Sequence, residues 1–335
     1  MAEENTNTFT QQVGNEIERL AGIDDFQIDL SLNYPEPKYT LFLHDTGTIP
    51  RGDLIAIKAK SKQGKSFLCC ALISSMFGCS EFSFTNADVG KVLYFDTEQN
   101  ERNTAKLVRR VHTLMNWQLD SNNPKFAAYA LRTAELPKRL EVIKGAIKKH
   151  HPSAVFIDGV ADLIDDFNSV EQSTKIINDL MELSASNDCA ICCVLHENKK
   201  DDDTGMKGHL GTMLLQKASD VFQIKKDGYQ FNVTETDCRN VPIEDFSFVV
   251  DGHGIPRKGV SITESKKTAK ENRIRKVMVE CFATQPEQTY TELYQAYMLH
   301  GAVGQAQAKN CVRDAKEFGI IETIPSTSQY RLKSG

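Results

Sequence analysis

Short apolar runs alternate with segments of helix length from Leu54 onward. The runs are almost continuously hydrophobic, which is typical of parallel strands that helices cover on both faces. The pattern therefore predicts an α/β fold with a mostly parallel central sheet. The predicted strands are Leu54–Ala59, Val92–Asp96, Phe126–Leu131, Ala154–Asp158 and Ala190–Leu195, and the predicted helices are 64–77, 101–117, 137–150 and 172–186.

The pattern changes after residue 220. Three apolar runs follow one another closely, with turn residues such as Asp227-Gly228 between them. This spacing predicts antiparallel strands that finish the sheet. The predicted strands are Val221–Lys225, Gln230–Thr236 and Phe246–Asp251.

The last part of the chain has a helical pattern. Gly, Pro, Lys and Ser are frequent in 253–270, which predicts a linker. Three helices and a β-hairpin then follow, an arrangement typical of a winged helix, although a generic helical cap is the alternative. The predicted elements are helices at 270–283, 289–299 and 304–318 and strands at Ile320–Thr323 and Gln329–Leu332.

At the other end, Phe9, Val13, Ile17 and Leu20 share one helical stripe and predict an amphipathic helix over 9–21. The chain is long for one domain. The predicted organisation is an N-terminal lead-in at 1–37, an α/β domain at 38–252, the linker at 253–270 and a winged-helix-like domain at 271–335.

Composition narrows the class of protein. The 335 residues are 40% hydrophobic and 25% charged, as in ordinary globular proteins. No apolar run is long enough to span a membrane, and the polar, acidic start lacks the features of a secretory signal, so we expect a cytoplasmic protein without a membrane partner. The net charge is −5, but the chain from residue 266 onward is mildly basic, an asymmetry that can reflect nucleic-acid contact.

The nine cysteines do not predict a metal site. Five of them lie inside apolar runs, and neither a second CxxC nor paired histidines stand at metal-binding spacing. Buried free thiols are the simpler interpretation, in agreement with a reducing cytosol. The five are Cys69, Cys70, Cys189, Cys192 and Cys193.

A phosphate-binding loop is the strongest chemical signal. The run Ala59-Lys60-Ser61-Lys62-Gln63-Gly64-Lys65-Ser66 lies between a predicted strand and a predicted helix. Such a turn directs backbone N–H groups at phosphates, while the lysine reaches the terminal phosphates and the hydroxyl binds magnesium. The first position is usually Gly and is Ala59 here; a chance match in a basic loop is the alternative. The predicted ATP-binding residues are Lys62, Gln63, Gly64, Lys65, Ser66 and Phe67.

Two further strands end in carboxylates. The run 154–158 ends in Asp158, as does a strand that holds Mg²⁺ together with Ser66. The run 92–95 ends in Asp96-Thr97-Glu98, and here the sequence resembles the RecA-like ATPase superfamily, whose members carry a catalytic glutamate after the strand that follows the P-loop helix. The resemblance implies that Glu98 is the general base for the attacking water, with Asp96 as the competing carboxylate.

The resemblance extends to the next strand. It implies that His196, a polar residue at the strand end, senses the γ-phosphate; a structural histidine is the alternative. The glycine-punctuated segment Lys199–Thr212 resembles the loop that contacts DNA in RecA-like rings and filaments, with Lys207 and His209 as candidates, although a merely solvated loop explains the composition equally well.

Arg239 resembles the cationic finger that hexameric helicases of this superfamily supply to a neighbouring subunit. A guanidinium there would neutralise charge on the transferred phosphoryl group. A surface salt bridge is the alternative. If the finger works between chains, the active unit is a homo-oligomer, with a hexamer favoured.

Within the superfamily, residues 38–250 resemble the plasmid replicative helicases related to RepA. The phrases Val194–Lys199 and Gly208–Thr212 favour this branch. For the C-terminal domain, the helix beginning at Gly304 would present Gln305, Gln307, Lys309 and Arg313 to duplex DNA. Asp314 and Glu317 on the same helix weaken that interpretation, and winged helices also bind proteins.

The resemblance implies an ATP- and Mg²⁺-dependent, DNA-stimulated ATPase that translocates on single-stranded DNA during replication or transfer of a plasmid or mobile element. A nucleotide-switched DNA-binding regulator without motor activity is the second hypothesis. A degenerate ATPase that only scaffolds partners is the third, and the intact Lys65, Ser66 and Glu98 argue against it.

Overall fold

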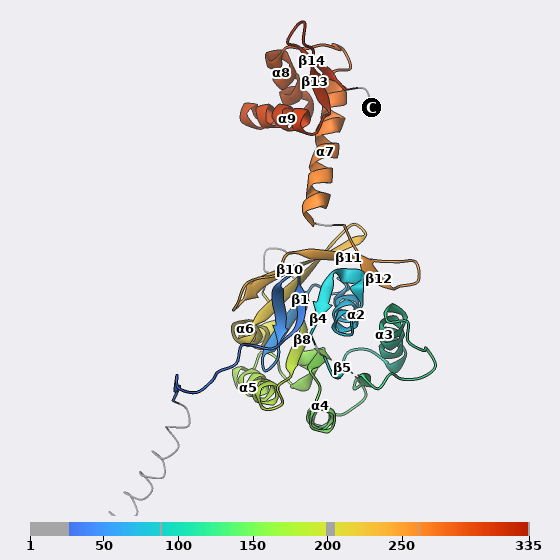
Figure 1. Cartoon of the computed structure of the whole chain (residues 1–335), viewed down its shortest axis with the longest axis vertical. Coiled ribbons are helices and arrows are strands. Elements are labelled where there is room, and N and C mark those ends of the chain that lie inside the picture. Colours follow the sequence, from blue (N-terminus) through green and yellow to red (C-terminus); the bar gives the residue numbers. More distant parts are fainter. Residues whose placement is uncertain (1–26, 88, 199–204, 261, 334–335) are drawn as a thin grey trace, which may run out of the picture. The chain divides into compact units, whose positions relative to one another are not determined.

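The computed structural model describes residues 27–87, 89–198, 205–260 and 262–333 (Figure 1). The chain divides into two units after Lys38. The described part of the first unit, residues 27–38, contains neither helix nor strand, and the second unit begins at Tyr39. The helix predicted over 9–21 lies outside the described residues.

A mixed, mostly parallel sheet forms the centre of the second unit (Figure 1). Among the described residues it contains nine strands in the order β12-β11-β10-β9-β3-β8-β7-β5-β6. The pairs from β9 to β6 are parallel, and those from β9 to β12 are antiparallel. The strands are β3 (Leu54–Ala59), β5 (Val92–Asp96), β6 (Phe126–Ala130), β7 (Ala154–Asp158), β8 (Ala190–His196), β9 (Asp220–Asp227), β10 (Gln230–Cys238), β11 (Phe246–Val250) and β12 (Pro256–Lys258).

Helices cover both faces of this sheet, as its continuously apolar strands require. One buried cluster joins sheet residues such as Ile57 and Phe156 to α2 and α3, and a second joins Val155 and Phe95 to α4, α5 and α6. The helices are α2 (Lys65–Met76), α3 (Glu101–Leu114), α4 (Leu136–His150), α5 (Val170–Ser186) and α6 (Gly208–Lys217). The α/β prediction is confirmed, including every predicted strand of the central sheet.

A small antiparallel sheet, ordered β2-β1-β4, was not predicted. Its strands are β1 (Tyr39–Leu43), β2 (Thr46–Pro50) and β4 (Phe84–Asn86). β1 pairs with residues about 40 positions away in β4, for example Leu43 with Phe84. Such a long-range pair leaves no local sequence pattern.

The C-terminal part contains three helices and a short antiparallel pair of strands, as the sequence predicts. They are α7 (Ile262–Cys281), α8 (Tyr290–Gly301), α9 (Gln305–Glu317), β13 (Ile321–Thr323) and β14 (Tyr330–Leu332). These elements share their own core, in which Met278, Leu293 and Val312 are almost fully buried. A capping box between Thr289 and Glu292 begins α8.

Two segments differ from the sequence expectations. Strand β12 and the first turns of α7 lie within 253–270, where the sequence predicts a linker. Helix α6 begins at Gly208, inside the segment interpreted as an extended loop. Its short apolar stripe, Leu210 and Leu214, packs into the core. Glycines at 208 and 211 hide this stripe, because glycine is a poor helix former.

The prediction of free thiols is confirmed. All nine cysteines are unpaired, and only Cys238 and Cys311 are more than marginally accessible. Burial raises the pKa of the Cys69, Cys70 and Cys192 thiols. In the described part of the chain, no group of three possible ligands could hold a metal ion, and no helix is long and apolar enough to cross a membrane.

Candidate nucleotide site

The P-loop connects β3 to α2, where its backbone turns sharply. Gly64 has a φ of 88°, a left-handed conformation that favours glycine. A Cβ at Gly64 would lie 2.7 Å from the ring of Phe231, so the loop needs glycine here for a second reason. The Gln63 side chain accepts a hydrogen bond from the amide of Lys226 at 2.8 Å, which fixes the loop against the β9–β10 hairpin.

Ala59, the departure from the usual motif, causes no conflict. It is fully buried as the last residue of β3, and its carbonyl accepts a hydrogen bond from the Glu197 amide at 3.0 Å. Since Ala59 is an extended strand residue outside the positive-φ positions, it has no conformational need for glycine. The cradle itself begins after Ala59 and is unaffected.

Three predicted residues form a chain of polar contacts at the mouth of the loop. The Lys65 Nζ lies 2.8 Å from His196 Nδ1, and His196 Nε2 lies 3.4 Å from Glu98 Oε1. If the ammonium donates to Nδ1, the proton of a neutral imidazole is on Nε2 and faces Glu98. Contact with His196 lowers the pKa of Glu98, and burial lowers the pKa of Lys65 against the opposing charges of Asp158 and Glu98.

The predicted magnesium ligands also meet. Ser66 Oγ donates to Asp158 Oδ2 at 2.8 Å, and the Tyr94 hydroxyl donates to the same oxygen. Burial raises the pKa of Asp158, while both hydrogen bonds oppose that shift. Hydroxyl and carboxylate oxygens are the donors that Mg²⁺ prefers, and a helix N-terminus beside them suits a triphosphate. The residues therefore fit Mg²⁺–ATP.

The two carboxylates after β5 occupy different surroundings. Asp96 is fully buried, and it accepts hydrogen bonds from the amides of Glu98 and Gln99 and from the Thr104 hydroxyl. Asp96 thus holds the turn that leads into α3. Glu98 keeps about a third of its side chain exposed and faces the P-loop cavity. The geometry favours Glu98 over Asp96 as the group that meets a water molecule.

These side chains line one cavity of about 430 Å³. The cavity includes all six predicted ATP-binding residues together with Glu98, Asp158 and His196. Sequence reasoning missed Gln99, whose side chain reaches Ser66 Oγ at 3.3 Å, and Tyr94, hidden as an apolar strand residue. It also missed Arg110, which enters the cavity from α3, far from any motif.

Arg239 is not part of this cavity. It follows β10, and its backbone amide donates to the Ser219 carbonyl. The strand register places it beside the beginning of β3, whereas the P-loop follows the end of β3. Its guanidinium donates to the Lys217 carbonyl at 3.1 Å, and its charge opposes the burial that raises the pKa of Asp53. Arg239 is therefore on the opposite edge of the sheet from the nucleotide site of its own chain.

The segment after His196 is tied to the site at its base. The Lys207 amide donates to the His196 carbonyl at 3.0 Å, and Glu197 pairs with Met206. Lys207 is exposed, with its Nζ 4.3 Å from the Phe167 ring centre. His209 is exposed in the first turn of α6. Both candidate DNA contacts thus stand near the end of the strand that carries His196.

The other two candidate DNA contacts, Lys309 and Arg313, line a hollow of about 340 Å³ on α9. Lys316, Tyr290 and Tyr330 also line it. Arg313 lies 3.5 Å from Asp314 and 3.9 Å from Glu317 in ion pairs, so part of its charge is compensated. The surface of α9 is nevertheless basic around the hollow.

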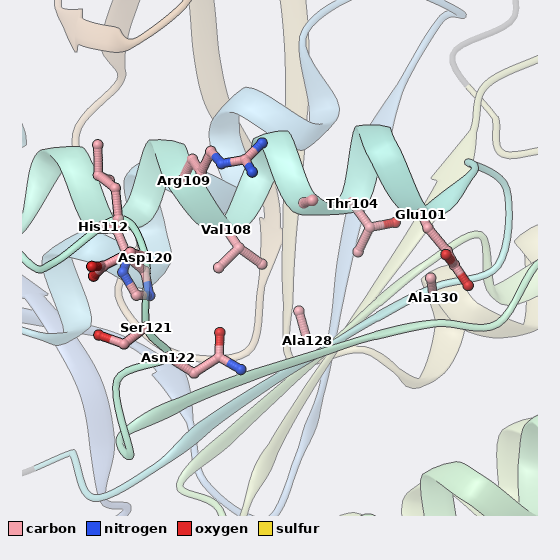
Figure 2. A pocket seen from close by; sticks show the side chains of 12 residues that line it. Glu101, Thr104, Val108, Arg109, His112, Asp120, Ser121, Asn122, Ala128 and Ala130 are labelled. Carbon is pink, nitrogen blue, oxygen red and sulfur yellow. The ribbon is translucent and has the colours of Figure 1, made fainter.

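A separate cavity of about 360 Å³ lies between α3 and the edge strand β6 (Figure 2). Figure 2 shows Glu101, Thr104 and Arg109 on the helix and Ala128 and Ala130 on the strand beneath. None of the predicted site residues lines this cavity.

Comparison with known proteins agrees with this geometry. Residues 18–202, more than half of the chain, match the AAA_25 family, an AAA domain. A similar solved structure is the ATPase domain of a helicase, with 14% identity, coverage of 63% of this chain and 86% of that chain, and a TM-score of 0.48. None of the curated proteins compared with the chain matches it. With its P-loop and RecA-like sheet, the chain belongs to the AAA_25 family of P-loop ATPase domains.

Proposed function

We propose that the protein hydrolyses ATP and couples hydrolysis to movement along single-stranded DNA, as a homo-oligomer, with a hexamer favoured. The observation that carries the proposal is the convergence of Lys65, Glu98 and His196 with the Ser66–Asp158 pair in one cavity. Replication or transfer of a plasmid or mobile element is the process that the resemblance to RepA-type helicases favours.

The residues divide the chemistry among them. Backbone amides at the start of α2 would hold the phosphates, and Lys65 would exchange His196 for a phosphate oxygen. Bound Mg²⁺ would supply charge neutralisation at the phosphates through Ser66 and Asp158. Glu98 would accept the proton of the attacking water, and its lowered pKa keeps it ionised for that role. His196, which contacts Glu98 and Lys65, would respond to the γ-phosphate.

The DNA part of the proposal has its own support. Lys207 and His209 are exposed beside the strand that ends in His196, so DNA contact there would be mechanically close to the phosphate. Lys309 and Arg313 would contact phosphates of duplex DNA if the C-terminal elements work as a winged helix.

The test is the rate of ATP hydrolysis with and without single-stranded DNA. We expect stimulation of several-fold, which Lys207→Ala lowers and Lys65→Ala abolishes together with the basal rate. Active hydrolysis at a rate that DNA leaves unchanged would contradict the motor and leave the ATPase. Strand separation on a forked duplex then distinguishes a motor from the second candidate, a nucleotide-switched DNA-binding regulator, which would bind the fork without unwinding it.

A further inference from the structure

The nucleotide cavity has two chemically different ends. Ser66, Asp158 and Glu98 form a polar end suited to phosphates and magnesium. Among the described residues that line the cavity, Phe67 contributes the one phenyl ring, and Arg110 lies against it. A nucleoside triphosphate has the same division, since its phosphates are polar anions and its base is a flat, mostly apolar ring.

Arg110 is held in a defined position from two sides. Its guanidinium carbon lies 4.4 Å from the centre of the Phe67 ring, a stacking distance. Its Nε donates to the Gly254 carbonyl at 2.9 Å. Gly254 belongs to the turn between β11 and β12, which Asp251 organises by accepting hydrogen bonds from the amides of His253 and Ile255.

The charge of Arg110 is not used within the fold. In the described part of the chain, no carboxylate lies within ion-pair distance of its guanidinium, although Arg257 and Arg275 do form such pairs. The side chain is half-buried, so its planar head is partly desolvated at the cavity wall. Guanidinium planes and aromatic rings are the groups on which nucleobases stack.

Direction along the loop assigns the ends. The P-loop and the first residue of α2 hold the terminal phosphates, and Phe67 is one residue beyond the metal-binding Ser66. The rest of the nucleotide must leave the cradle away from Asp158 and Glu98, since those carboxylates repel it. The wall on that side is Phe67 with Arg110.

We propose that Arg110 and Phe67 form the wall on which the base of the bound nucleotide stacks, so that Arg110 determines preference for base-containing over base-free polyphosphates. This inference rests on the proposed nucleotide-binding function and adds the site for the base. Arg110 acts through its flat shape as well as its charge.

The test compares two ligands in the same protein, ATP and inorganic tripolyphosphate, each with Mg²⁺. We expect Arg110→Ala in the full chain to weaken ATP binding about tenfold while tripolyphosphate binding stays within twofold. Arg110→Lys keeps the charge and loses the plane, so it should behave like Arg110→Ala. The matched control is Arg109→Ala, which removes the same charge from the next position of α3, outside this cavity.

Because the readout is a ratio within one variant, a general loss of folded protein cancels. An equal loss of both ligands in Arg110→Ala, or rescue by Arg110→Lys, would make Arg110 a phosphate ligand and overturn the base wall alone. If the wild-type chain bound neither ligand, the proposed function itself would be wrong, and the base wall with it.

Discussion

At the scale of single residues, the two carboxylates after β5 allow a sharp test. Glu98→Gln keeps the size of the side chain but cannot accept a proton from water. We expect turnover to fall about 100-fold or more while ATP affinity changes little. Steady-state hydrolysis and nucleotide titration measure the two quantities. Glu101→Gln, an exposed change in the first turn of α3, is the control and should leave turnover unchanged.

Asp96→Asn should behave differently. Its carboxylate accepts two backbone amides and the Thr104 hydroxyl in a buried turn, so the substitution weakens the fold. A variant Asp96→Asn that stays fully stable but stops hydrolysing, beside an active Glu98→Gln, would exchange the roles of the two residues.

A second prediction at this scale concerns pH. Burial raises the pKa of Glu235 from its ordinary 4.5 to about 7, and neighbouring Asp220 adds to the shift. The folded state therefore binds a proton more tightly than the unfolded state, so stability is complete below pH 4.5 and falls as pH rises through about 7. Glu235→Gln keeps an acceptor for the Ile243 amide and removes the charge.

We expect Glu235→Gln to be more stable than wild type at pH 8 by about 1 kcal/mol, a value reduced for partial solvent screening. The two proteins should converge near pH 5. Urea unfolding at both pH values measures this difference. Equal stability at pH 8 would mean that Glu235 ionises at its ordinary pKa.

At the scale of elements, two glycines separate backbone strain from close packing. Gly52 and Gly64 both have positive φ, 83° and 88°, but a Cβ meets no atom within 4 Å at Gly52 and meets Phe231 at 2.7 Å at Gly64. Alanine at either position should cost about 1 to 2 kcal/mol of folding stability from the backbone alone. Gly64→Ala should cost more and should also abolish ATP binding, because the loop must shift.

Thermal unfolding and nucleotide titration of both variants give the comparison. Gly52→Ala should bind ATP like wild type. If Gly64→Ala also did so, contact with Phe231 would not shape the cradle.

The central elements were predictable because each carries a local signal. Apolar runs and the phosphate-loop pattern indicated β3, α2, β5 and β7, and the carboxylates at two strand ends followed from the same runs. The small sheet, α6 and β12 were missed because long-range pairing or glycines hide them. Within the site, Arg110 could not be predicted, since only folding brings α3 and the turn at Gly254 together.

At the scale of the whole molecule, the position of Arg239 matters most. It stands on the sheet edge opposite the P-loop, so it cannot reach the phosphates of its own chain. As a finger in a neighbouring site it would still be effective. We expect Arg239→Ala to lower turnover at least about tenfold while each subunit binds ATP normally.

Mixing two inactive proteins tests this arrangement. Lys65→Ala removes the site but keeps the finger, and Arg239→Ala does the reverse. If the finger acts between subunits, the mixture should hydrolyse ATP faster than either protein alone. Absence of complementation in mixed assemblies, or loss of ATP affinity in Arg239→Ala, would make Arg239 a structural residue that holds the Lys217 carbonyl.

The distribution of thiols has a practical consequence for studying such an assembly. Because the other cysteines are buried, a maleimide dye should attach to the folded chain at Cys238 and Cys311. The first precedes Arg239 and the second lies on α9. The natural chain therefore carries one reporter for subunit association and another for the C-terminal surface, and replacing either cysteine by serine isolates the fluorescence of the other.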